Sequence, residues 1–120
     1  MTDDVEIVQL EDRANWRDWL ERNHETATAV WLVTWKKPTG KPRVDYDAAV
    51  EEGLCFGWVD SKSRSVDDER TSLYFTPRKA KSAWSESNVA RVEKLEAAGL
   101  MAAAGRRAVD EAKRLGTWPP

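Results

Sequence analysis

The stretch from Arg70 to Arg91 interleaves cationic side chains with aromatic and neutral polar ones. We expect a strand that ends at Pro77 in a basic loop, followed by a helix capped by Ser85. A helix N-terminus offers N–H groups and the positive end of the helix dipole, and guanidinium groups add charge-assisted hydrogen bonds. The stretch therefore predicts a site for an anion, with these candidate residues: Trp58, Arg70, Tyr74, Arg78, Lys79, Lys81, Trp84, Ser85 and Asn88.

Strand alternation predicts how this site is built. Arg70 and Tyr74 are an even number of residues apart, so they share one face of the strand. If Trp58 of a neighbouring strand lines the same side, it forms an aromatic floor beneath the cations. We expect Arg78→Ala to leave folding nearly intact because the loop lies at the surface. The plainer interpretation is that these charges solvate the loop and pair with nearby acids, and a third is that they form a surface for a protein partner.

The cysteine, histidine and clustered acidic residues indicate no catalytic or metal site. A single cysteine excludes an internal disulfide and a cysteine-based zinc site. Cys55 sits at a helix C-terminus between apolar neighbours, which favours a buried thiol of raised pKa over a nucleophile. With His24 as the only histidine, the sequence supports no metal site, and it has no phosphate-binding or dinucleotide motif. We expect no metal and no cofactor, and we interpret the acids at 67–69 as a solvated turn.

Three function classes stay open. The first is a small binding or stress-protection module that holds a small anionic ligand or an acidic protein segment in the basic loop. The second is an enzyme that uses Asp60 as an acid or base and arginines as a clamp. The third is a binder of single-stranded nucleic acid through aromatic and cationic side chains. A net charge of −2 counts against the third class, and we expect no binding to DNA.

The elements that position these residues fit one domain over 1–120, with 1–10 as a flexible acidic N-terminus. At 120 residues, the chain is long enough for one hydrophobic core. Periodicity and turn residues predict a small α+β domain of order α-β-α-β-β-α-α, with a mixed or antiparallel sheet packed against helices. The expected helices are 12–23, 46–56, 86–98 and 103–115, and the expected strands are 28–36, 58–66 and 70–76.

Seven tryptophans are spread along the chain, and we expect most of them to fill the core. The strand at 28–36 is apolar on both alternating faces, which predicts a central strand covered on both sides. The core is expected to contain Trp16, Trp31, Leu54, Phe56, Val92 and Val109.

Charge is distributed unevenly along the chain. Residues 1–77 hold 10 Lys and Arg against 16 Asp and Glu, whereas residues 78–120 hold 9 against 5. The C-terminal third can therefore carry a local basic patch on an acidic protein. No apolar run approaches the roughly 20 residues of a membrane-spanning helix, and the acidic N-terminus does not resemble a secretion signal.

Several strings carry a family resemblance, above all Leu-Cys-Phe-Gly-Trp-Val-Asp at 54–60 and Phe-Thr-Pro-Arg-Lys at 75–79. Further matches are Val30-Trp-Leu, Ser82-Ala-Trp-Ser, Gly99-Leu-Met and Gly116-Thr-Trp. Together they resemble the bacteriocin-protection family called YdeI/OmpD-associated. One departure is Ala102-Ala-Ala, where such sequences often carry Thr-Pro-Ala, and it removes a helix cap. The resemblance implies a bacterial, cytoplasmic setting and no transferable catalytic residue, and the family name alone implies association with a porin.

Overall fold

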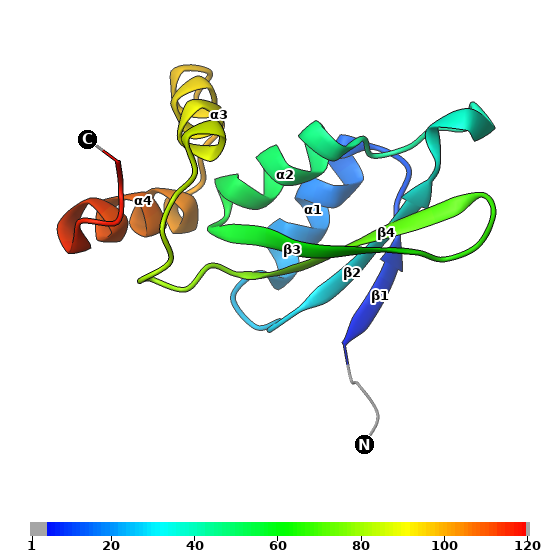
Figure 1. Cartoon of the computed structure of the whole chain (residues 1–120), viewed down its shortest axis with the longest axis horizontal. Coiled ribbons are helices and arrows are strands. Elements are labelled where there is room, and N and C mark those ends of the chain that lie inside the picture. Colours follow the sequence, from blue (N-terminus) through cyan, green and yellow to red (C-terminus); the bar gives the residue numbers. More distant parts are fainter. Residues whose placement is uncertain (1–4, 120) are drawn as a thin grey trace.

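The computed structural model describes residues 5–119 of the chain as a four-stranded sheet and four α-helices (Figure 1). The α-helices are α1 (Arg13–Asn23), α2 (Tyr46–Cys55), α3 (Glu86–Ala97) and α4 (Ala103–Leu115). The strands are β1 (Glu6–Gln9), β2 (Val30–Trp35), β3 (Trp58–Ser65) and β4 (Arg70–Pro77). A short 3₁₀ helix, η1 (Lys37–Thr39), follows β2. The α+β class and the mixed sheet are thus as predicted.

The order of elements differs from the prediction by one strand at the start. Glu6–Gln9, part of the expected flexible N-terminus 1–10, forms β1 and pairs parallel with β2. Residues 1–4 lie outside the described part of the chain. The strands lie in the order β1-β2-β4-β3, with β4 antiparallel to both of its neighbours. The β1-α1-β2 unit is therefore the parallel crossover, and β3 and β4 form an antiparallel hairpin.

Side-chain caps explain where three of the helices begin. Asp12, Asp45 and Ser85 each accept a hydrogen bond from the backbone N–H three residues later. This contact satisfies one of the four N–H groups that a helix start leaves without an intrahelical partner. Helix α4 begins after Ala102 with no side-chain cap, as its Ala-Ala-Ala sequence predicts.

The hydrophobic core lies on one face of the sheet, beneath α1 and α2 (Figure 1). Trp16 and Phe75 are fully buried there, and Trp19 meets the ring of Trp58 edge to face, with the centroids 5.8 Å apart. Five of the six predicted core residues belong to this cluster, namely Trp16, Leu54, Phe56, Val92 and Val109.

Trp31 is the exception: β2 is the predicted central strand and its residues are buried on both faces, but helices cover only one of these faces. Along β2, Val30 and Leu32 face the helices, so the alternation of the strand turns Trp31 and Val33 to the other face. In the described residues no helix covers that face (Figure 1). Trp31 is nevertheless only 7% exposed, because long side chains of β3 and the ring of Tyr74 cover it.

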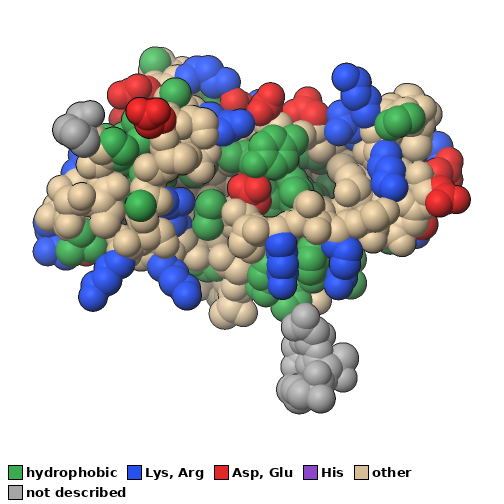
Figure 2. All heavy atoms as spheres, in the orientation of Figure 1, with side chains coloured by type: hydrophobic (Ala, Val, Ile, Leu, Met, Phe, Trp, Pro, Cys, Tyr) green, Lys and Arg blue, Asp and Glu red, His purple; other side chains and the backbone are tan. Residues whose placement is uncertain are grey.

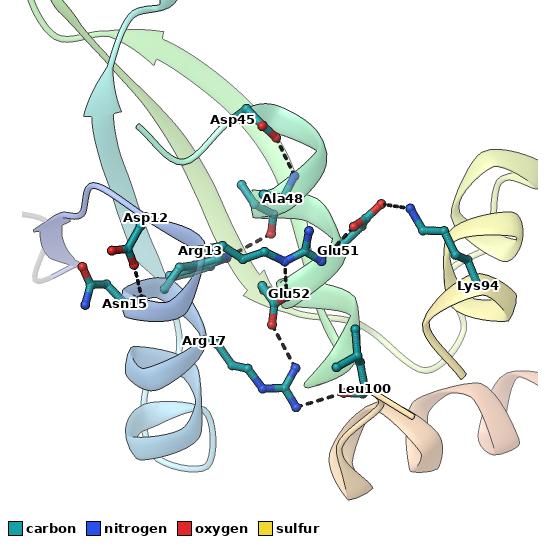
Figure 3. A network of polar contacts seen from close by, with 12 residues as sticks. Asp12, Arg13, Asn15, Arg17, Asp45, Ala48, Glu51, Glu52, Lys94 and Leu100 are labelled. Carbon is teal, nitrogen blue, oxygen red and sulfur yellow. Dashed lines mark hydrogen bonds and ion pairs between the residues drawn. The ribbon is translucent and has the colours of Figure 1, made fainter. Parts of the chain in front are cut away.

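A network of ion pairs joins three helices beside the core (Figure 3). Glu51 and Glu52 of α2 are buried, and Arg13 of α1 donates to both of them, at 2.8 and 2.5 Å. Lys94 of α3 pairs with Glu51, and Arg17 of α1 pairs with Glu52. Buried carboxylates need such partners because desolvation otherwise outweighs their favourable interactions. The network therefore sets how α1 and α3 lie against α2.

Helix α4 packs against the end of α2 through backbone contact. The N–H of Ala102 donates to the carbonyl oxygen of Cys55 at 3.0 Å. A Cβ atom at Gly105 would lie 2.3 Å from the same oxygen, so only glycine allows this approach. In the described part of the chain, no helix is both long and apolar enough to cross a membrane.

Candidate functional site

The candidate residues of the basic stretch do not form one site. Trp58 is 1% exposed and lies in the core beside Trp19, on the helix-covered face of the sheet. Arg70 and Tyr74 share the opposite, open face, as the alternation predicted. The expected aromatic floor of Trp58 beneath these cations is therefore absent, and the sheet itself separates the two groups.

Arg78 and Trp84 meet beyond the end of β4. The guanidinium carbon of Arg78 lies 3.9 Å from the centroid of the Trp84 ring, and its Nη2 donates to the carbonyl oxygen of Ala83 at 2.6 Å. The loop thus closes on itself, and it lies beside α4, where a hollow of about 190 Å³ is lined by residues that include Lys79 and Arg107. Burial lowers the pKa of Arg78, and its Nε has no hydrogen-bond partner among the described residues.

The remaining candidates in the basic stretch have separate contacts. Ser85 caps α3, and the Asn88 side chain accepts a hydrogen bond from Arg91, which also pairs with Asp47 of α2. Lys81 is exposed. Ser85 and Asn88 are therefore engaged in local structure, and the convergence predicted for residues 78–88 is limited to Arg78, Lys79 and Trp84.

The open face of the sheet carries a different group of cationic and aromatic side chains. The register places Ile7, Trp31, Tyr74 and Lys62 side by side across the four strands. The next row holds Gln9, Val33, Ser72 and Arg64. Figure 2 shows Lys and Arg side chains beside hydrophobic ones along the lower margin of the molecule, below the sheet.

Contacts within and between these two rows hold the cationic side chains in place. The Nζ of Lys62 lies 4.6 Å from the centroid of Tyr74, and the guanidinium carbon of Arg64 lies 4.3 Å from the centroid of Trp31. The rings of Trp31 and Tyr74 are themselves in contact, with centroids 4.8 Å apart. Cation–π attraction thus holds both positive groups over a paired aromatic surface.

A β-bulge in β3 makes this arrangement possible. Asp60 pairs with Phe75, but the next paired residue is Lys62, opposite Tyr74, so Ser61 is the extra residue. Without the bulge, Lys62 and Arg64 would keep the alternation of Trp58 and point toward the helices. The bulge therefore moves two cations from the core side to the open face.

Beside Trp31 the open face is hollowed to about 340 Å³. Ser72 is the smallest side chain of its row, and it leaves space between Val33 and Arg64. The hollow is lined by Ile7, Gln9, Trp31, Val33, Arg64, Ser65, Val66, Arg70 and Ser72. Its volume falls at the lower end of the range for small-molecule sites, roughly 300 to 1,000 Å³.

The cations around this hollow differ in their partners. Arg70 is paired with Asp67 at 2.8 Å and donates to the Oε1 of Gln9 at 2.9 Å. Hydrogen bonds from Arg70 and from the backbone of the turn lower the pKa of Asp67. Within residues 5–119, no carboxylate lies within ion-pair distance of Lys62 or Arg64. Among the described residues, these two side chains therefore carry positive charge on the open face that no ion pair compensates.

The alternative catalytic residue, Asp60, accepts a hydrogen bond from Tyr46 at 3.1 Å. Burial, followed by the neighbouring Asp60, raises the pKa of Tyr46. No arginine of the described residues forms an ion pair with Asp60, since the nearby Arg91 pairs with Asp47. The arginine clamp of the enzyme hypothesis is thus not assembled in this structure.

The thiol and the acidic turn have structural environments. Cys55 is fully buried, and burial, with a further contribution from Glu52, raises its pKa to about 11. Asp67 accepts hydrogen bonds from the backbone N–H groups of Glu69 and Arg70, which forms the turn between β3 and β4. Among the described residues, no group of His, Cys, Asp and Glu side chains could hold a metal ion.

Two residues of the open face, Arg70 and Tyr74, are among the site residues predicted from the sequence, whereas Trp31, Lys62 and Arg64 are not. A strand that is apolar on both faces looks like a buried strand, so Trp31 was assigned to the core. Lys62 and Arg64 alternate along β3, which is a signal of a polar face. The side to which they point depends on a bulge that no turn residue or glycine marks.

A family model described as a domain of unknown function, DUF8412, matches residues 8–108. The chain belongs to this family. The DUF8412 match includes β2, β3 and β4 and therefore the residues of the open face on these strands. No curated protein and no solved structure matches the chain.

Proposed function

We propose that this DUF8412 protein is a small binding module that holds an anionic ligand against the open face of its sheet. The observation that carries the proposal is the pair of cations, Lys62 and Arg64, held over Tyr74 and Trp31 beside a hollow. The predicted basic stretch contributes Arg70 and Tyr74 to this face. Arg78 and Trp84, in contrast, lie in a separate loop.

Charge supports an anion over a neutral or cationic ligand. The protein has a net charge of −2, yet the described lining of this hollow contains no acidic side chain, and Asp67, which lies outside the lining, is paired with the lining residue Arg70. A guanidinium group stacked on an indole keeps its N–H edge available for a carboxylate or phosphate. An acidic ligand in the hollow would therefore meet the restrained guanidinium of Arg64, whereas the ammonium group of Lys62 lies over Tyr74, outside the lining of the hollow.

An NMR titration of the ¹⁵N-labelled protein with sodium acetate and with sodium phosphate tests this proposal. We expect the largest shifts at residues 62–74 and around Trp31, and weaker binding as salt rises, because exposed charges are screened within about 8 Å at physiological ionic strength. Arg64→Gln should remove most of the response. Arg106→Gln, which removes one exposed charge from α4, should leave it intact.

Two results would contradict the proposal. One is the absence of any saturable shift on the open face with either anion. The other is a response centred on residues 78–85, which would move the site to the loop of Arg78 and Trp84. An acidic peptide that binds where the small anions do not would favour the protein-partner hypothesis.

The wider biological role is a second proposal that rests on the resemblance alone. The matching family model carries no function, so the relationship to YdeI/OmpD-associated proteins, the stress-protection role and the cytoplasmic setting remain predictions. Assay of bacteriocin sensitivity in cells with and without the gene tests them. Unchanged sensitivity would contradict the protective role and leave the binding proposal in place.

A further inference from the structure

We infer that the ligand of the open face is a small carboxylate with a flat or branched apolar body. This inference rests on the proposed function and adds the class of ligand. The carboxylate would meet Arg64, and the apolar body would lie in the hollow over Val33. Two features of the hollow support the inference. Its lining is partly apolar, and only one of its cationic side chains lacks a carboxylate partner in residues 5–119.

The apolar part of the hollow comes from two strands and a turn. Val33 and the edge of Trp31 belong to β2, Ile7 to β1, and Val66 follows β3. Ile7 is 66% exposed and Val66 is 44% exposed, so two large aliphatic side chains present apolar surface to water at the same hollow. A ligand with an apolar body would cover both side chains, whereas a bare inorganic anion would leave them in water.

The polar side chains that line the hollow suit a ligand with a single negative charge. Arg70 is already engaged by Asp67 and Gln9, so Arg64 is the cation at the hollow that lacks a carboxylate partner in residues 5–119. Because the Oε1 of Gln9 accepts from Arg70, the amide nitrogen of Gln9 is left to donate. One guanidinium and one neutral donor suit a singly charged carboxylate better than a phosphate dianion or a chain of phosphates.

The same geometry disfavours single-stranded nucleic acid. Binders of single strands offer exposed aromatic faces on which bases stack. Trp31 is 7% exposed, and Arg64 lies over its ring, so the indole face is already occupied. A base could stack there only if Arg64 moved away, which would also remove the cation from its ordered position.

A matched set of probes tests the class of ligand: sodium acetate, sodium benzoate and sodium 2-naphthoate, with benzyl alcohol as the neutral analogue. Affinities are measured by NMR titration of the full chain. We expect benzoate to bind at least about tenfold more tightly than acetate, since it adds burial of an apolar ring. We expect naphthoate to bind at least as tightly as benzoate, and benzyl alcohol to give no saturable shift on the open face.

Two variants separate the apolar and the charged contributions. Ile7→Ser should weaken benzoate binding severalfold and leave acetate unchanged, and the exposure of Ile7 makes this change safe for folding. Leu115→Ser is the matched control, because it removes a partly exposed aliphatic side chain from α4. Arg64→Gln should weaken the binding of acetate and of benzoate by the same factor.

The outcomes distinguish the inference from the proposed function. If acetate and benzoate bind the open face equally well, or if Ile7→Ser does not change the affinity for benzoate, the inference of an apolar ligand body is wrong. The proposed anion site would not be affected by this result. If phosphate or an oligonucleotide binds more tightly than all three carboxylates, the class of ligand is wrong. If no anion binds this face, the proposed function fails as well.

Discussion

The guanidinium carbon of Arg64 lies 4.3 Å from the ring centroid of Trp31, although β4 separates their two strands in the sheet. The residue of β4 opposite Arg64 is Ser72, whose hydroxyl donates to the carbonyl oxygen of Arg64 at 2.7 Å. A small side chain at this point lets the arginine reach across the middle strand. Trp31 is therefore covered by charged side chains, and its contribution to stability and to binding should be separable.

Trp31→Ala should cost less stability than Trp58→Ala. Truncation of a fully packed aromatic residue costs about 3 to 5 kcal/mol. Trp58 is enclosed between sheet and helices, whereas Trp31 is covered on the open face by the flexible side chains of Lys62 and Arg64 and by the ring of Tyr74. Chemical denaturation of both variants measures the difference, and Trp31→Ala should in addition abolish the anion response of the open face. Equal losses of stability would mean that Trp31 is a core residue after all.

Gly105→Ala should destabilise the protein even though alanine favours helices. Alanine is worth about 1 kcal/mol over glycine inside a helix. The added Cβ would lie 2.3 Å from the carbonyl oxygen of Cys55, and backbone cannot move aside as a flexible side chain can. We expect a net loss of about 1 to 3 kcal/mol, as for other overpacked sites. Arg106→Ala in the same helix is the control, and a Gly105→Ala variant as stable as this control would exclude the close approach.

Features of this molecule that depend on neighbouring residues could be predicted from the sequence, and features that depend on pairing between distant segments could not. The caps at Asp45 and Ser85 and the ends of the helices are local signals, and the structure confirms them. Strand β1 was missed because it contains four residues and its pairing partner is distant in sequence. The face to which Lys62 points was hidden for a similar reason, since the bulge at Ser61 appears only in the pairing with β4. Local pattern therefore predicted the elements, and long-range register decided the site.

Cys55 should react slowly with alkylating agents in the native protein at neutral pH. Burial raises the pKa of the thiol to about 11, so almost none of it is thiolate at pH 7. Alkylation should become fast only when a denaturant unfolds the chain. Cys55→Ala should retain the anion response of the open face. Rapid stoichiometric labelling of the folded protein by iodoacetamide would contradict both the burial and the absence of a nucleophile.

The ion pairs of Glu51 should make stability depend on pH in the acidic range. Burial by itself raises the pKa of this carboxyl, but hydrogen bonds from Lys94 and Arg13 outweigh it, and the pKa is lowered from 4.5. The folded state then binds its proton less readily than the unfolded state. The stabilisation is present above about pH 4.5 and is lost as the pH falls through the lower, folded-state pKa.

Denaturation curves between pH 3 and pH 7 measure this effect in the native protein and in Glu51→Gln. The variant should be less stable at pH 7 because Arg13 and Lys94 lose their charged partner, and its stability should vary less with pH. Glu93→Gln is the control, since Glu93 is an exposed acid of α3 that takes no part in the network. Parallel pH profiles of native protein and Glu51→Gln would show that the network does not act as described.

Arg78→Ala should reduce stability, in contrast to the expectation from a surface loop. Arg78 is half-buried, and it both stacks on Trp84 and donates to the carbonyl oxygen of Ala83. Hydrogen bonds from charged groups are worth about 1.5 to 3 kcal/mol, and an exposed cation–π contact adds roughly 0.5 to 1 kcal/mol. We expect a loss of about 2 to 4 kcal/mol, with the anion response of the open face unchanged. Lys79→Ala, next to it and exposed, should change stability by less than about 0.5 kcal/mol. If Arg78→Ala instead left stability intact and abolished anion binding, the site would lie in this loop, and the open face would have been assigned wrongly.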